Sequence, residues 1–280
     1  MECYHYKKQI YTNGILNKSV DATYIIHLDG NGRLDNIHKQ LAEYQPTNII
    51  YILFNKGYKK CKKNDEINQP AFDLVDTYLH IFNHAKQSNY NNILILEDDF
   101  VFNEKIKDQT NTIPINTFVN KHKDTNFIYY LGCIPFLQVP FDYYHNITIL
   151  ACGSHAIIYS KKYREQILDI DQTTILDWDV FLMTSTFLNR YCYYTPLCYQ
   201  LFPETENSKL WGIGINETFS KIFVFIMQTI IQTLKLDVQT EPGYSLLYAF
   251  SKIIFYILII LALLILFWSK YKYKSYKTKS

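Results

Sequence analysis

The chain has 280 residues, 48% of them hydrophobic, and its formal net charge is +2. This length holds one large domain or two small ones, and the apolar content is ample for a packed core. A net charge so close to zero argues against a polyanionic ligand, so we expect no nucleic-acid partner. The six cysteines include no Cys-x-x-Cys pair, which argues against a zinc or redox motif, and we expect mostly buried thiols in a reducing compartment.

The N-terminal third of the chain alternates between strand and helix signals. Apolar runs predict strands over 23–28 and 48–54, and apolar residues at helical spacing predict helices over 33–44 and 70–85. A third strand follows from Ile93. This alternation is typical of an α/β fold, with an open, mostly parallel sheet, right-handed crossovers and flanking helices.

The middle of the chain continues the same pattern as far as residue 208. Strands are predicted over 127–132, 147–151, 156–159 and 191–194, and helices over 161–168 and 178–188. The strands over 147–151 and 156–159 are expected to form a pair near the site. We therefore expect a globular domain over 21–208, preceded by an N-terminal extension over 1–20.

Two apolar segments follow this domain. Residues 209–244 include an amphipathic stretch, which fits a helix that lies in the membrane interface or covers the core of the domain. Residues 245–269 are long and apolar enough for a transmembrane helix, and a Lys/Tyr-rich tail over 270–280 ends the chain. We expect a single-pass C-terminal (tail) anchor with the domain in the cytosol, because the N-terminus carries no secretory signal. The lysines of the tail argue for the opposite orientation.

The third strand ends in three consecutive carboxylates, Glu97, Asp98 and Asp99. Ligands of open α/β sheets bind outside the carboxyl ends of the strands. Clustered oxygen ligands at such an end suit a divalent cation, Mn²⁺ or Mg²⁺, which in turn suits a diphosphate. We take Asp99 as the main candidate metal ligand, with Glu97 or Asp98 assisting. The alternative is an acidic turn that ends a strand and stays solvated.

Five segments, at residues 24–29 with Arg33, 95–99, 153–161, 176–179 and 196–200, in that order, resemble glycosyltransferase family 25, which includes lipooligosaccharide and procollagen galactosyltransferases. Residues 24–29, with Arg33, resemble the opening strand of the family, and residues 95–99 match its L-E-D-D element. Gly153-Ser154-His155-Ala156-Ile157-Ile158-Tyr159-Ser160-Lys161 is similar to the family's G-x-H-A-Y-x-I-S-x segment, Leu176-Asp177-Trp178-Asp179 to its P-x-D element, and Pro196-Leu197-Cys198-Tyr199-Gln200 to its closing P-x-x-x-Q. The order and spacing agree over residues 23–208.

This resemblance implies a GT-A-like (Rossmann-like) fold, a nucleotide-sugar donor such as UDP-galactose, a glycan or protein acceptor, and inversion at the anomeric carbon. The chain departs from the family in two places. His27 stands where the family has asparagine, and residues 68–72 replace the G-C-x-x-S-H segment.

The resemblance also suggests roles for single residues. Asp177 is the first candidate for the base that deprotonates the acceptor hydroxyl, and Asp179 is the second. Whichever of the two begins the following helix has a simpler role as its N-terminal cap. The candidates for binding the donor are His27, Leu28, Arg33, Glu97, Asp98 and His155. For His155 a hydrogen-bonded structural role is an equal alternative, and for Arg33 so is a solvated side chain at a helix start.

Together these observations predict a membrane-anchored glycosyltransferase that moves a hexose, galactose by resemblance, from a UDP-sugar to a hydroxyl. Two other functions use the same residues. One is a catalytically inactive, membrane-tethered binding module, and the other is a metal-dependent phosphotransfer or hydrolytic enzyme.

Overall fold

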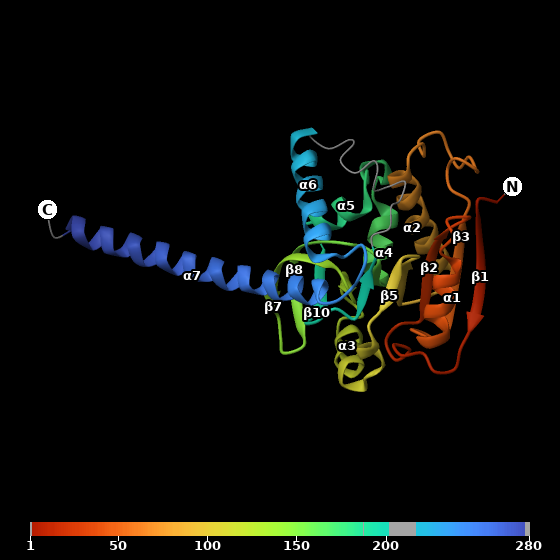
Figure 1. Cartoon of the computed structure of the whole chain (residues 1–280), viewed down its shortest axis with the longest axis horizontal. Coiled ribbons are helices and arrows are strands. Elements are labelled where there is room, and N and C mark those ends of the chain that lie inside the picture. The colour runs from red at the N-terminus through yellow and green to blue at the C-terminus, as the bar shows by residue number, and fades with distance from the viewer. Residues whose placement is uncertain (1, 187, 202–216, 278–280) are drawn as a thin grey trace.

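The computed structural model describes residues 2–186, 188–201 and 217–277, and it contains a nine-stranded sheet, a two-stranded sheet and flanking helices (Figure 1). The strands are β1 (Tyr4–Ile10), β2 (Ala22–Leu28), β3 (Ile49–Asn55), β4 (Asn92–Glu97), β5 (Phe100–Phe102), β6 (Phe127–Tyr130), β7 (Ile134–Pro140), β8 (His145–Cys152), β9 (Ala156–Ser160), β10 (Asn189–Tyr193) and β11 (Cys198–Gln200). The helices are α1 (Leu34–Glu43), α2 (Pro70–Gln87), α3 (Gln109–Lys121), α4 (Lys161–Asp169), α5 (Trp178–Thr184), α6 (Glu217–Leu234) and α7 (Gly243–Lys277).

The large sheet has the order β1-β3-β2-β4-β9-β6-β10-β8-β7. Strands β3, β2 and β4 are parallel neighbours, as the alternation predicts. Strand β9 lies antiparallel between β4 and β6, and β10 is parallel to β6. Six of the nine strands (β2, β3, β4, β6, β7 and β10) therefore run in one direction. The open, mostly parallel α/β sheet is confirmed.

Both faces of the sheet are packed, which explains the unbroken apolar run of β4. Ile93 and Ile95 belong to one core, which α2, α4 and α5 cover, and Leu94 and Leu96 belong to the other, which α1 and α3 cover. All four side chains are fully buried. Glu97 and the residues after it therefore emerge from a rigid part of the molecule.

Two local predictions are wrong. The segments around 147–151 and 156–159 are strands, but they do not pair with each other, since β6 and β10 separate β8 from β9. The helix predicted over 178–188 ends at Thr184. It stops there because Ser185 has an extended backbone and its hydroxyl donates to the carbonyl of Phe181, and the chain must then enter β10.

The C-terminal helices lie at one side of the domain. Helix α7 begins against β7 and then leaves the domain as a long projecting helix (Figure 1). Residues 243–273 form a helix long and apolar enough to cross a membrane, and its side chains beyond Ile253 are almost all exposed. Helix α6 packs partly on the domain, with Met227 buried beside Tyr244, while Phe225 is 69% exposed. The predicted boundary at residue 208 lies outside the described residues.

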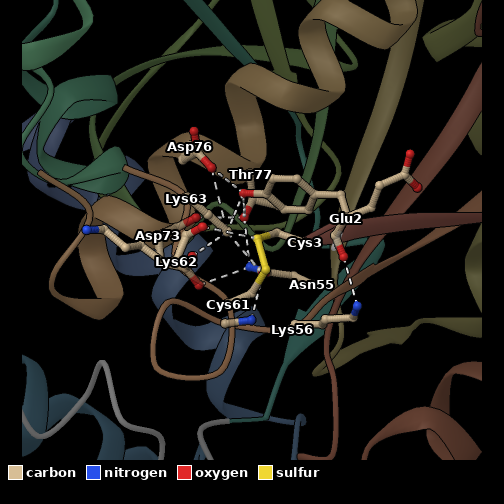
Figure 2. Close-up of a disulfide and its surroundings, with 12 residues drawn as sticks. Glu2, Cys3, Asn55, Lys56, Cys61, Lys62, Lys63, Asp73, Asp76 and Thr77 are labelled. Carbon is tan, nitrogen blue, oxygen red and sulfur yellow. Dashed lines mark hydrogen bonds and ion pairs between the residues drawn. A yellow bond between two sulfur atoms is a disulfide. The ribbon is translucent and has the colours of Figure 1, made fainter. Parts of the chain in front are cut away.

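One cysteine prediction needs correction. Cys3 and Cys61 form a disulfide, which joins the start of β1 to the loop between β3 and α2 (Figure 2). The loop is also held by Lys63, whose buried ammonium group binds Asp73 and the carbonyl oxygen of the Asn55 side chain. The separation of 58 residues in the sequence gave no signal of this pairing. The other four cysteines are buried free thiols, as expected.

Candidate functional site

The acidic turn lies where the sequence analysis expects it, at the carboxyl ends of adjacent parallel strands. Strand β4 pairs with β2 up to the pair Ile26 and Glu97, so the turn after β4 adjoins the end of β2. The backbone then returns through β5, which pairs with β11. Groups from two other parts of the chain, residues 27–33 and Gln200 of β11, therefore converge on Asp98 and Asp99.

Asp98 holds the end of β2 in place. Its Oδ2 accepts hydrogen bonds from His27 Nδ1 (3.2 Å), Leu28 N (3.3 Å) and Asn31 Nδ2 (2.5 Å), and its Oδ1 accepts from Arg33 Nη1 (2.7 Å). Burial raises the pKa of Asp98, but the hydrogen bond from His27 and the charge of Arg33 lower it more, to below its ordinary value. Both oxygens are occupied, so Asp98 has the contacts of a positioning residue.

Asp99 has one free oxygen. Gln200 Nε2 donates to Asp99 Oδ2 at 3.1 Å, and Arg33 Nη1 lies 3.6 Å from the same atom. Asp99 Oδ1 is buried and has no hydrogen-bond partner in the described part of the chain. Burial and the neighbouring charge of Glu97 raise the pKa of Asp99 to about 8. A buried acceptor without a donor calls for an explanation, such as a role in binding a cation or a proton.

Glu97 also belongs to a second group of carboxyls, which includes Asp177 and Asp179. Its Oε1 accepts hydrogen bonds from Ser154 Oγ (2.6 Å) and Tyr78 Oη (2.9 Å). Burial raises the pKa of Glu97 although both hydrogen bonds oppose the shift. Glu97 therefore links the turn to α2 and to the loop between β8 and β9.

Asp179 and Asp177 complete this second group, and the structure gives them different contacts. Asp177 is the N-terminal cap of α5, because its side chain accepts from Val180 N at 3.0 Å. Asp179, in the first turn, interacts with the Ser154 hydroxyl and with the backbone N–H of Gly153. Burial and the charges of Asp177 and Glu97 raise the pKa of Asp179 well above its ordinary value.

His155 is a buried neutral imidazole beside this site. Its Nε2 donates to the carbonyl oxygen of Cys198 at 3.3 Å, while Nδ1 is without a partner among the described residues. Burial lowers the pKa of His155 to about 4, so it is uncharged at neutral pH. The close approach needs glycine at Gly132, where a Cβ would lie 1.7 Å from the Cys198 oxygen and 2.9 Å from the imidazole.

The carboxyls fit a cation that arrives with its substrate. No three His, Cys, Asp or Glu side chains in the described ranges stand close enough to hold a metal ion by themselves. The free Oδ1 of Asp99 nevertheless suits one coordination position. Mg²⁺ is commonly held by one or two carboxylates together with waters and substrate phosphates. A nucleoside diphosphate would supply those phosphates.

The sequence analysis thus found the carboxyls of the site but missed several residues that hold them. Tyr78, Ser154 and Asn31 contact the acidic turn from distant parts of the chain. Gln200 stood in a quoted motif without a role. The apolar spacing of α2 placed Tyr78 on the inner face of that helix, and this was the one available signal for it.

Comparisons with known proteins give likenesses in structure only. No family model matches the chain, and neither does any curated protein sequence. Among solved structures, the chain is similar to A197 from STIV, with a TM-score of 0.40 and 13% identity over 66% of this chain and 86% of that one. It is also similar to a glycosyltransferase involved in the glycosylation of the major capsid of PBCV-1, with a TM-score of 0.39 and 12% identity over 65% of this chain and 95% of that one.

A further likeness is to mannose-1-phosphate geranyltransferase from Thermus thermophilus, with a TM-score of 0.33 and 8% identity over 61% of this chain and 73% of that one. Identities this low leave the donor, the acceptor and the metal to be argued from the residues of this chain. The resemblance to family 25 accordingly stands on the quoted motifs alone.

Proposed function

We propose that the chain is a membrane-anchored glycosyltransferase that moves a hexose from a UDP-sugar, galactose by the motif resemblance, to a hydroxyl of a glycan or protein acceptor. The observation that carries the proposal is Asp99. This carboxyl is buried at the carboxyl end of a parallel strand, two side chains fix one of its oxygens, and the other oxygen has no partner in the described part of the chain.

The residues around Asp99 suit a diphosphate. A divalent cation, Mn²⁺ or Mg²⁺, bound to Asp99 would neutralise charge on the departing diphosphate. The guanidinium of Arg33 lies beside the two aspartates with its side chain 21% exposed, so it adds a positive charge within reach of a ligand. The hydrogen bonds that Asp98 accepts from His27 and Leu28 hold the end of β2 against the turn that follows β4.

We assign the role of base to Asp179 before Asp177. A general base works best when its pKa is near the operating pH, and burial with two neighbouring carboxyls raises that of Asp179. Asp177 is already engaged as the cap of α5. The base takes the proton of the acceptor hydroxyl as its oxygen attacks the anomeric carbon and the bond to the diphosphate breaks.

The test is turnover of nucleotide sugars by the full-length protein in nanodiscs with Mn²⁺. Release of UDP from one UDP-hexose, with the sugar transferred and its anomeric configuration inverted, is the expected result. Asp99→Asn should abolish it. Binding of UDP-sugars without turnover would indicate the inactive binding module, and phosphate release from other phosphoesters would indicate a hydrolytic or phosphotransfer enzyme.

We also propose an orientation in the membrane. Helix α7 fits a C-terminal membrane anchor, and the exposed apolar face of α6, with Ile222 and Phe225, fits the membrane interface beside it. The Cys3–Cys61 disulfide favours an oxidising compartment for the domain, and the Lys-rich tail favours the cytosol for the other end. The disulfide and the tail both support a domain on the side of the membrane away from the cytosol, whereas the sequence analysis expects a cytosolic domain.

A further inference from the structure

The first turn of α7 contacts β11, the strand that pairs with β5 after the acidic turn. Tyr244 is fully buried, and its hydroxyl makes two hydrogen bonds to the backbone of Gln200. It accepts from Gln200 N at 3.0 Å and donates to Gln200 O at 3.0 Å. A single hydroxyl in the first turn of the candidate membrane helix thus binds both the backbone N–H and the backbone carbonyl oxygen of Gln200 in β11.

Gln200 carries this contact to the candidate site. Its Nε2 donates to Asp99 Oδ2, and the next residue, Leu201, donates its N–H to the Asp99 carbonyl at 3.3 Å. Because Oδ2 is occupied in this way, Oδ1 is the oxygen left to accept a ligand. The position of Gln200 therefore decides which oxygen of Asp99 is free and where it points.

The start of α7 is packed from several sides. The ring of Tyr199 lies 5.2 Å from that of Tyr244, and its hydroxyl donates to Glu241 Oε1 at 2.5 Å. At Gly243 a Cβ would lie 2.4 Å from the side chain of Leu236, so this end of the helix fits closely against the chain before it. The first turn of α7 therefore cannot move without disturbing β11.

We infer that Tyr244 and Gln200 are positioning residues for Asp99, so that the first turn of the membrane helix is part of the candidate site as well as of the anchor. The inference rests on the proposed function in one respect only, which is that Asp99 receives the cation. The structural part of the inference, which is that Tyr244 fixes the acidic turn through Gln200, can be tested without any ligand.

Three variants of the full-length protein in nanodiscs separate this role from general packing. Tyr244→Phe removes the hydroxyl that holds Gln200, and Gln200→Ala removes the donor to Asp99. Tyr248→Phe is the matched control, because Tyr248 is equally buried in the next turn of α7 but its hydroxyl contacts Cys133 Sγ at 3.5 Å. With Mn²⁺ as the probe, in the presence of saturating UDP, we expect the half-saturating Mn²⁺ concentration to rise roughly 10-fold in the first two variants and to stay unchanged in Tyr248→Phe. Saturating Mn²⁺ should restore full occupancy.

Hydrogen exchange of β5 and of the Leu201 amide gives a second readout. Tyr244→Phe should speed exchange there, and Tyr248→Phe should not. The inference is overturned if exchange and Mn²⁺ binding in Tyr244→Phe match the wild type, or if Tyr248→Phe changes both equally. A wild-type protein that binds no Mn²⁺ in the presence of UDP, with faster exchange in Tyr244→Phe, would support the positioning role and remove the cation from the proposed function.

Discussion

Arg33 donates to Asp98 at 2.7 Å, and the same nitrogen lies 3.6 Å from Asp99. A single guanidinium therefore pairs with the ionised Asp98 just after β4 and lies beside Asp99, whose pKa of about 8 keeps that carboxyl mostly protonated at neutral pH. Both Asp side chains are less than a tenth exposed, so solvent screens the pairing of Arg33 with Asp98 only weakly. The ion pair is a structural element of the candidate site before any ligand binds.

Arg33→Ala should destabilise the domain by about 2 kcal/mol at neutral pH, because it leaves the buried, ionised carboxylate of Asp98 without its cation. The folded-state pKa of Asp98 lies below 3.8, so the stability it contributes is present above about pH 4 and is lost as the pH falls through the folded value. The melting temperature of the variant should therefore approach that of the wild type below pH 4. Arg33→Lys, which keeps the charge, should lose less. An equal deficit at pH 3 and pH 7 would contradict this account.

Asp99→Asn should stabilise the domain above pH 4. The pKa of Asp99 is raised from 3.8 to about 8, so the folded state holds a proton that the unfolded state has released, and wild-type stability falls as the pH rises between these values. Removing the charge removes that loss, which is at most about 4 kcal/mol at pH 7. Thermal unfolding of both proteins from pH 3 to 8 checks this, and the difference should vanish at pH 3. A variant less stable than the wild type at pH 7 would argue against a buried, unfavourable charge.

Asp179→Asn should lower the rate of transfer by roughly 10²–10⁴ while leaving donor affinity unchanged, because the substitution removes only the proton acceptor. Asp177→Asn is the matched comparison, since asparagine caps a helix as well as aspartate does and the rate should fall little. Steady-state kinetics with donor titration measure both. The reverse result would return the role of base to Asp177.

Cys3→Ser should lower the free energy of unfolding by about 2–4 kcal/mol, because the disulfide closes a loop of 58 residues and fixes β1 to the sheet. Dithiothreitol should lower the melting temperature of the wild type and leave that of Cys3→Ser unchanged. The four buried cysteines provide the internal control, as their thiols are not expected to respond. A wild-type melting temperature that ignores dithiothreitol would show that the disulfide is absent in solution.

Glycosylation of Asn17 should report the orientation of the domain. Asn17 is exposed and begins an Asn-x-Ser sequon, whereas Asn146, in a second sequon, is only 3% exposed in β8. Expressed in eukaryotic cells, the protein should carry a glycan that Asn17→Gln removes, and the domain should resist protease added to intact microsomes. An unglycosylated, digestible domain would restore the cytosolic orientation.

The central strands could be predicted from the sequence because strands buried on both faces consist almost entirely of apolar residues. The runs around Ile25 and Ile93 are apolar without alternation, as strands covered on both faces require. Two strands at the edges of the sheet were missed. Tyr4–Ile10 in β1 carries two lysines, and β7 contains Pro135 and Pro140, features that suit an edge and weaken a strand signal.

The candidate site was predictable only in part, for a related reason. The carboxyls Glu97, Asp98 and Asp99 are adjacent in sequence, so their position after a strand pointed to a site. The groups that fix them come from elsewhere, as Ser154 does from the loop after β8 and Gln200 from β11. Ser154 reaches the acidic turn because β9, which follows it in the chain, pairs antiparallel with β4. No local sequence pattern predicts that β9 is the neighbour of β4.

The unbroken course of α7 has a consequence for the acceptor. The helix runs from Gly243 to Lys277, and Ser251, on its inner side, still donates to Gln138 of β7 where the apolar stretch begins. With the helix in a bilayer, no hinge separates the domain from the lipid surface, so the tilt of the helix and the height of the domain are linked. Such an enzyme would reach hydroxyls at one distance from the membrane, which favours acceptors that are themselves held at the lipid surface over those that diffuse freely.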